Sequence, residues 1–322
     1  GFGPNYELPN ATAYTETCAA IALMLWNQRM FLKSGEVKYM DLFERTLYNG
    51  FLSGVSFEGN TFFYPNPLEA DGFTKFNQGV CGRSPWFDCS CCPVNVVRIL
   101  PSLPGYIYAT KENKVFVNLY MSNRAEITLG NQTLQLSQTT NYPWDGKIEI
   151  EVVNTTTVSA VFNLRVPGWV RNEVMDGDLY SYADEYTPAV SLKVNGKNVN
   201  PLIKNGYITL EKQNWQSKDK ITIAFEMPVR TVVSNDLVSA NKGKMALERG
   251  PLVFCAEEAD NPDGILNSQV PSDEVFTYKY EQELLGGIGK ITSPSITAIP
   301  YYAWAHRGNG EMAVWLNKIS AQ

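Results

Sequence analysis

Histidine is almost absent from this sequence: His306 is the single one among 322 residues. A metal site in the N-terminal part of the chain must therefore use sulfur and carboxylate ligands. Basic residues are not in excess either, since 27 Lys and Arg face 33 Asp and Glu, for a formal charge of -6. Nucleic acids and anionic membranes require a basic surface, so we expect neither as a partner. A small, neutral ligand fits this charge better.

Long apolar runs are also missing. No stretch approaches the ~18 consecutive apolar residues of a membrane span, so we expect none. Residues 1–20 lack the basic start and apolar centre of a signal peptide. The opening GFGPNYELPN is typical of the interior of a longer chain, and we expect an N-terminal segment to precede it.

Cysteine is scarce but clustered. Of the six cysteines, four lie between Cys81 and Cys92. Disulfide frameworks are usually spread along a chain, whereas clustering favours metal or redox chemistry. The paired CxxC motifs of a structural zinc site are missing. Three thiolates and a carboxylate satisfy tetrahedral zinc, and the segments that could supply them are Glu16-Thr17-Cys18 and Cys89-Ser90-Cys91-Cys92.

Two plainer interpretations of these residues stay open. Buried free cysteines behave as small hydrophobic side chains, and Glu16 could simply stabilise the first turn of a helix. Alternatively, Cys91 and Cys92 could form disulfides with Cys81, Cys89 or Cys18.

Apolar spacing predicts helices over 16–31 and 37–49, and a third that begins at Pro93. Proline suits a first helical position because its missing N–H has no partner there. Cys91 and Cys92 would then lie at or just before a helix N-terminus. Amide groups there, like a bound cation, lower the pKa of a thiol.

From about residue 108 the apolar period changes to two, which predicts strands. Asn195-Gly196 between alternating runs indicates a type I′ hairpin. Segregated helices and strands predict separate helical and β-sandwich domains. The predicted strands are 114–121, 147–153, 160–166, 191–199, 220–227 and 250–257.

Several motifs together resemble glycoside hydrolase family 127, the β-L-arabinofuranosidases, and the related family 146. They follow in order from YELPN, AYTETCA and FERTLYNG through WFDCSCCPVNVVRIL to NYPWDGKIEI, VPGWVR, ALERGPLVFCAE and PYYAWAHRGNGEM. The resemblance implies a multidomain α + β fold, in which the C-terminal part of an (α/α)6 toroid is followed by β-sandwich domains. It places the toroid part at 1–107, one sandwich at 108–228 completed by 305–322, and a second at 229–304.

The same resemblance implies a zinc ion held by Glu16, Cys18, Cys91 and Cys92, with Cys91 as the nucleophile of a retaining hydrolase and Cys89 as a neighbour. Glu16 would also contact substrate. Glu44 and Tyr64 match substrate-binding positions of the family. Their plainer interpretations are a surface helix carboxylate and a half-buried strand tyrosine.

The implied function is the release of β-L-arabinofuranose from plant-derived oligosaccharides or polysaccharides, in a bacterial periplasm, outside the cell or in the cytoplasm. The family's acid/base glutamate would lie just before Gly1, so we expect this chain to be inactive alone and to expose apolar helix faces. A missing N-terminal segment, a second polypeptide or a homodimer partner would complete it. The alternative is a carbohydrate-binding or structural module with a purely structural zinc site.

Overall fold

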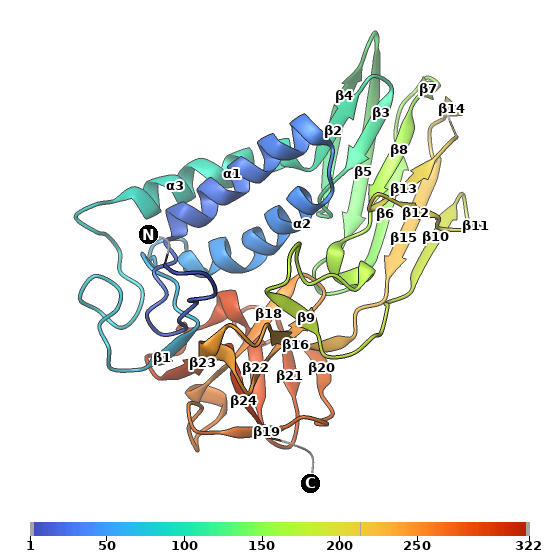
Figure 1. Ribbon diagram of the computed structural model, residues 1–322. Coiled ribbons are helices and arrows are strands. Elements are labelled where there is room, and N and C mark those ends of the chain that lie inside the picture. The colour runs from blue at the N-terminus through green and yellow to red at the C-terminus, as the bar shows by residue number, and fades with distance from the viewer. Residues whose placement is uncertain (1–2, 213, 320–322) are drawn as a thin grey trace.

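The computed structural model describes residues 3–212 and 214–319. Helices occupy the first third of the chain and strands most of the remainder, in three packed parts (Figure 1). Gly1 and Phe2, beside which the acid/base glutamate is expected, lie outside the described residues. Within them, no helix is both long enough and apolar enough to cross a membrane.

Three α-helices form the N-terminal part: α1 (Thr17–Ser34), α2 (Lys38–Arg45) and α3 (Cys91–Ile99). Gly35 ends α1 in the left-handed region at φ 72°, where glycine avoids the steric cost of a side chain. α2 continues as a π-helical turn over Thr46–Phe51 and a 3₁₀ turn over Leu52–Gly54. All three predicted helices are therefore confirmed, although α3 begins two residues before Pro93.

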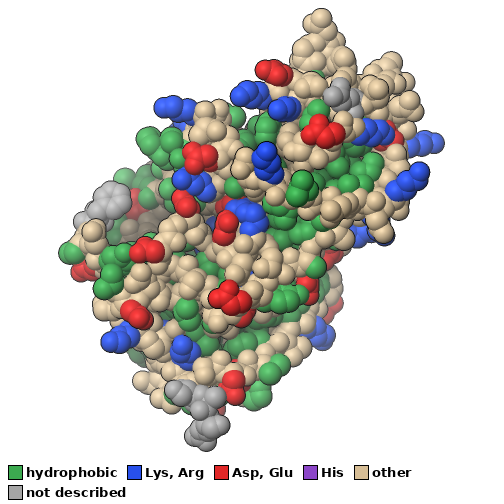
Figure 2. Space-filling model, turned by 45° about the vertical axis from the view of Figure 1, so that its right-hand side comes forward, with side chains coloured by type: hydrophobic (Ala, Val, Ile, Leu, Met, Phe, Trp, Pro, Cys, Tyr) green, Lys and Arg blue, Asp and Glu red, His purple; other side chains and the backbone are tan. Residues whose placement is uncertain are grey.

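The (α/α)6 toroid is not confirmed, since three α-helices in the described residues do not make one. What the structure shows is a multidomain fold of few helices and mostly strands. As expected, the helices present apolar side chains to solvent: Trp26 on α1 is 65% exposed and Val97 on α3 is 69% exposed. Figure 2 shows acidic and basic side chains scattered together over one face, without a continuous basic patch.

Two sheets form the middle part. The first has the order β12-β13-β8-β3-β2 and the second β11-β10-β15-β6-β5-β4. Alternate residues such as Ile148, Ile150 and Val152 are fully buried, as the period of two predicts for a sandwich. The bounds of the first sheet are β2 Tyr108–Lys111, β3 Lys114–Val117, β8 Val161–Arg165, β12 Ile203–Lys204 and β13 Tyr207–Leu210. Those of the second are β4 Asn123–Leu129, β5 Gln132–Thr140, β6 Lys147–Val152, β10 Val190–Val194, β11 Lys197–Val199 and β15 Lys220–Phe225.

The predicted hairpin is present, because β10 pairs with β11 across Asn195-Gly196. Both turn residues have positive φ, 50° and 77°, as a type I′ turn requires. A separate two-stranded ribbon joins β7 (Val158–Ser159) to β14 (Asn214–Trp215).

The third part is an eleven-stranded sheet whose central order is β19-β24-β17-β18-β22-β21-β20. Its flanking strands are contributed from all along the chain: β1 (Glu69–Asp71) pairs with β23, and β9 (Tyr180–Tyr182) pairs with β16. The remaining bounds are β16 Val229–Ser234, β17 Lys244–Arg249, β18 Leu252–Glu257, β19 Gln269–Pro271, β20 Thr277–Glu281, β21 Ile288–Thr292, β22 Thr297–Pro300, β23 Glu311–Ala313 and β24 Leu316–Ile319.

We expected residues 305–322 to complete the middle sandwich. This expectation is wrong for β23 and β24, the two strands that the structure describes in that range, because both join the third part. β23 pairs with β1 and β18, and β24 pairs with β17 and β19. Met312 and Leu316 are buried on this third sheet. An alternating pattern identifies a strand and its apolar face but not the sheet edge that it joins.

Candidate metal centre

The N-terminal ends of α1 and α3 bring together cysteines that are 73 residues apart in the sequence. Cys18 lies in the first turn of α1, two residues after Glu16, and Cys91 and Cys92 are the first two residues of α3. Both helices start on the same side of the molecule (Figure 1). Since a helix N-terminus presents unpaired amide groups, this arrangement suits thiolates.

The three sulfur atoms form a compact group. Cys18 Sγ lies 3.3 Å from Cys91 Sγ, and Cys91 Sγ lies 3.9 Å from Cys92 Sγ. All three lie within 4.8 Å of one another, and Glu16 Oε2 is 3.0 Å from Cys18 Sγ. Tetrahedral zinc with bonds of about 2.3 Å to sulfur separates its sulfur ligands by about 3.8 Å. The three sulfur atoms are therefore close enough to share one metal ion, and thiolates are ligands that zinc prefers, whereas Glu16 contacts Cys18 but is not part of the three-sulfur group.

A buried polar network holds the start of α1 in place. Thr17 is fully buried; its N–H donates to Tyr64 O at 3.0 Å and its hydroxyl donates to Phe63 O at 2.7 Å. The Asn66 amide donates to the Thr17 hydroxyl at 3.0 Å. Gly54 allows this approach, because a Cβ there would lie 2.2 Å from Thr17 Oγ1. Glu16 and Cys18 flank Thr17 and are thus tied to the segment that carries Tyr64.

Tyr64 borders the cysteine group. Its hydroxyl lies 3.3 Å from Cys91 Sγ, and only 8% of the residue is exposed. Phe87 packs edge-on against the Tyr64 ring, with ring centroids 5.4 Å apart. The centroid of the exposed Tyr14 ring lies 6.3 Å from that of Tyr64. The structure thus brings Tyr64 to the predicted site. Tyr14 borders the site too, although the sequence analysis did not select it despite its position in the AYTETCA motif.

Burial and hydrogen bonding give the three thiols different acidities. Burial raises the pKa of the Cys91 thiol, but hydrogen bonds with the Tyr64 hydroxyl and Cys18 outweigh it, so this pKa lies below its ordinary value. Burial raises the pKa of Cys92 to about 11. Burial and the Glu16 carboxylate raise the pKa of Cys18 strongly. Without a metal, Cys91 is therefore the readiest of the three to become a thiolate.

The disulfide interpretation is wrong, because all six cysteines are free. The closest sulfurs in the group, at 3.3 Å, are well beyond the bond length of about 2.05 Å. Cys89 is exposed and lies outside the three-sulfur group.

Glu44 does not join this group. It is 2% exposed, accepts a hydrogen bond from the Tyr142 hydroxyl at 2.9 Å and pairs with Arg165 Nη2 at 2.5 Å. Burial raises the pKa of the Glu44 carboxyl despite the opposing charge of Arg165. The residue is therefore a buried link between α2 and the middle part, not a surface carboxylate.

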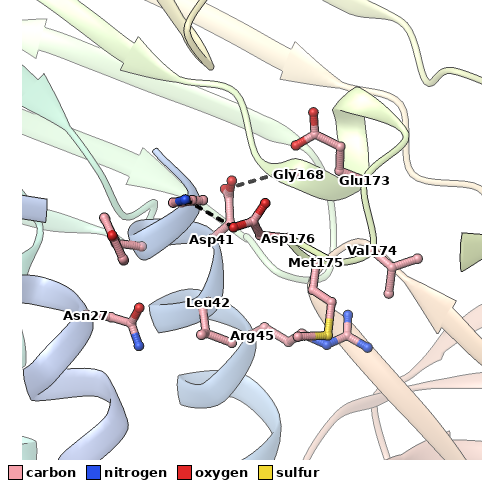
Figure 3. Close-up of a pocket in the computed structure, with 11 residues that line it drawn as sticks. Asn27, Asp41, Leu42, Arg45, Gly168, Glu173, Val174, Met175 and Asp176 are labelled. Atoms are coloured by element: carbon pink, nitrogen blue, oxygen red, sulfur yellow. Dashed lines mark hydrogen bonds and ion pairs between the residues drawn. The ribbon is translucent and has the colours of Figure 1, made fainter. Parts of the chain in front are cut away.

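A cavity of about 350 Å³ lies away from the cysteines, between α1, α2 and the loop around residues 168–176 (Figure 3). Its charged lining residues already have partners. Asp41 pairs with Arg165 at 2.7 Å and with Arg171 at 2.8 Å, while Arg45 pairs with Glu248. This cavity shares no residue with the sulfur group.

Three family models match successive parts of the chain. The β-L-arabinofuranosidase GH127 catalytic domain matches residues 1–105, the GH127 middle domain 114–227, and the glycoside hydrolase family 127 C-terminal domain 229–317. A curated non-reducing end β-L-arabinofuranosidase of Bifidobacterium longum subsp. longum is 31% identical over 353 residues. That match covers 98% of this chain and 50% of the relative.

Solved structures agree with these matches. A GH127 β-arabinofuranosidase has a TM-score of 0.92 and 44% identity, covering 99% of this chain and 51% of that one. A GH127 β-L-arabinofuranosidase from Geobacillus stearothermophilus T6 has a TM-score of 0.86 and 36% identity, covering 98% and 51%. The chain thus spans about half the length of the relatives that it matches.

Proposed function

Since the chain belongs to glycoside hydrolase family 127, we propose that it carries the nucleophile and metal ligands of a retaining β-L-arabinofuranosidase. The substrates would be arabinofuranose-containing glycans of plant origin. The relatives described as β-L-arabinofuranosidases support this substrate class. The observation that carries the proposal is the group of Cys18, Cys91 and Cys92 sulfurs within 4.8 Å, with a carboxylate beside it.

Glu16, Cys18, Cys91 and Cys92 would hold the zinc ion. Bound zinc would keep the cysteine sulfur deprotonated at neutral pH and would help it to leave again. The Tyr64 hydroxyl, 3.3 Å from Cys91 Sγ, is positioned to donate a hydrogen bond to the thiolate. The donor set of this chain therefore prepares one sulfur for nucleophilic attack.

The reaction would proceed by double displacement. The Cys91 thiolate attacks the anomeric carbon, a C–S bond forms, and the glycosidic C–O bond breaks as its oxygen receives a proton. Water then attacks the same carbon, its proton passes to the base, and the C–S bond breaks to restore the thiolate. Two inversions at one carbon retain the configuration. We propose that a glutamate before Gly1, the position that the family resemblance implies, serves as the acid/base group.

A substrate with a leaving group that needs no protonation tests the nucleophile directly. The zinc-loaded chain would be incubated with 2,4-dinitrophenyl β-L-arabinofuranoside, and intact and peptide masses would be measured. We expect one pentosyl group on Cys91, which accumulates because the activated leaving group speeds the first step and leaves hydrolysis of the C–S bond rate-limiting. Elemental analysis of the same sample should find about one zinc per chain.

Matched variants decide the assignment. Cys91→Ser should abolish the label, and Cys89→Ser, a change at an exposed neighbour outside the group, should retain it. Zinc without label on the unaltered chain would favour the structural-module alternative. A label on Cys89 would contradict the role of Cys91.

A further inference from the structure

Asn77 hydrogen-bonds to Tyr64, which borders the candidate metal centre, but not to the proposed ligands Glu16, Cys18, Cys91 and Cys92. It is fully buried, and its side-chain amide bridges two segments of chain. Asn77 Oδ1 accepts a hydrogen bond from the Tyr64 N–H at 2.7 Å, while Asn77 Nδ2 donates to Phe62 O at 3.0 Å and Gly82 O at 2.8 Å. One amide thus joins the Tyr64 segment to the loop that leads to Cys91.

The backbone around Asn77 makes this bridge rigid. Asn77 and Val80 exchange both backbone hydrogen bonds, at 3.0 and 3.3 Å, across a turn with positive φ at Gln78 and Gly79. Phe62 and Ser84 likewise exchange hydrogen bonds of 2.8 and 2.9 Å. Backbone hydrogen bonds therefore fix both Asn77 itself and Phe62, one of the residues to which its side chain donates.

The other end of the Tyr64 peptide is anchored to α1. Tyr64 O accepts the Thr17 N–H at 3.0 Å, next to Cys18. With its N–H held by Asn77 and its carbonyl held by Thr17, the Tyr64 main chain has little freedom. Its hydroxyl is then directed to within 3.3 Å of Cys91 Sγ.

We infer that Asn77 is a positioning residue that holds the Tyr64 hydroxyl against the sulfur of Cys91. This inference rests on the proposed function, because the contact between the Tyr64 hydroxyl and Cys91 Sγ has a role in catalysis only if Cys91 is the metal-bound nucleophile. Hydrogen-bond partners around metal ligands orient them, and their loss typically costs about 10- to 100-fold in metal affinity. Asn77 does not contact a proposed ligand itself; it contacts Tyr64, which in turn contacts Cys91.

The test compares Asn77→Ala, Tyr64→Phe and the double variant in the full chain loaded with cobalt(II). Each single change should shift the sulfur-to-cobalt charge-transfer band in the same direction and weaken zinc binding about 10-fold. If Asn77 acts through the Tyr64 hydroxyl, the double variant should match Tyr64→Phe alone. Shifts that add in the double variant would overturn the inference.

A second readout does not depend on metal. In chain labelled with 3-fluorotyrosine, the Tyr64 fluorine signal is identified by its loss in Tyr64→Phe. It should move or broaden in Asn77→Ala, because an unheld main chain lets the ring shift. An unchanged Tyr64 signal in a destabilised Asn77→Ala protein would overturn the inference. Cobalt binding that fails in the unaltered chain would contradict the proposed function, and the fluorine signal would still decide the role of Asn77.

Two further variants complete the design. Asn77→Asp keeps an acceptor for the Tyr64 N–H but turns an oxygen toward Phe62 O and Gly82 O, so it tests the bridge if Asn77→Ala does not fold. It should also displace the Tyr64 signal. Asn163→Ala is the control, since Asn163 is a buried asparagine in β8 that is hydrogen-bonded to Thr209. It should lower stability without moving the Tyr64 signal.

Discussion

Neighbouring residues in this chain differ sharply in their chemistry because their surroundings differ. Cys91 and Cys92 are adjacent, yet Cys92 is fully buried, while Cys91 is partly exposed and hydrogen-bonded to Tyr64. Burial raises the pKa of Cys92 to about 11, whereas hydrogen bonds lower that of Cys91. Residue type alone therefore does not say which of the two thiols is the more acidic; the groups around each thiol decide it.

The one histidine also has a defined environment. His306 Nε2 accepts the Phe57 N–H at 3.2 Å, which leaves Nδ1–H to donate to Ala303 O at 2.8 Å. Its ring stacks on Phe57 with centroids 4.1 Å apart. Burial, reinforced by the nearby Arg83 charge, lowers its pKa below the ordinary 6.5. In the neutral form of the ring, both nitrogens are thus hydrogen-bonded.

This environment predicts a pH dependence. Because the folded-state pKa of His306 is depressed, the folded chain binds fewer protons than the unfolded chain below pH 6.5. The stability due to His306 is present above the unfolded pKa and is lost as pH falls toward the folded one. Thermal unfolding at pH 7.5 and 5.5 should show a smaller loss of stability in His306→Gln than in the unaltered chain. Equal losses would contradict this assignment.

Among the elements, the start of α1 depends on close packing against the 3₁₀ turn at Leu52–Gly54. Thr17 packs against Gly54 and hydrogen-bonds to the Tyr64 segment, so the first turn of α1 and two of the proposed metal ligands are located together. The Glu16 and Cys18 positions therefore follow from a packing contact as well as from helix formation.

Gly54→Ala should disturb this contact, because the added Cβ would lie 2.2 Å from Thr17 Oγ1. Overpacking of this kind costs about 1–3 kcal/mol, and zinc affinity should fall as the start of α1 shifts. Chemical denaturation and zinc competition would measure both effects. Gly105→Ala is the control, since a Cβ there meets nothing within 4 Å. Equal stability of the two variants would contradict the packing argument.

Across the whole molecule, Arg165 ties the helices to the middle sandwich. It lies in β8, is fully buried, and reaches Asp41 at 2.7 Å and Glu44 at 2.5 Å on α2. It also donates to Asn118 O at 2.5 Å. A buried guanidinium needs such partners because it loses its hydration. The orientation of α2 on the sandwich therefore depends on this group.

Glu44→Gln should destabilise the chain, since removal of one partner leaves the Arg165 charge poorly compensated. The expected cost is about 3–5 kcal/mol in the free energy of unfolding, measured by chemical denaturation. Lys279→Ala, which breaks the exposed pair of Lys279 with Glu281, should cost about 0–1 kcal/mol. Unchanged stability in Glu44→Gln would show that the pair is not needed for the fold.

Local sequence patterns identified the three helices and six stretches of strand, but not every element, since β4 and β5 fall outside the predicted strands. Period 3.6 identified the helices, period two identified the strands, and Asn195-Gly196 identified a hairpin, because each of these is a local property of the backbone. Cysteine clustering and the family motifs selected the three sulfur residues that the structure brings together.

The tertiary structure shows which surfaces from distant parts of the chain meet. It placed Cys18 beside Cys91, joined β23 and β24 to the third sheet, and buried Glu44 against Arg165. The sequence analysis also missed Asn77, whose partners are backbone groups that carry no residue signature. Local patterns show which face of an element is apolar, but the partner of that face depends on packing of the entire chain.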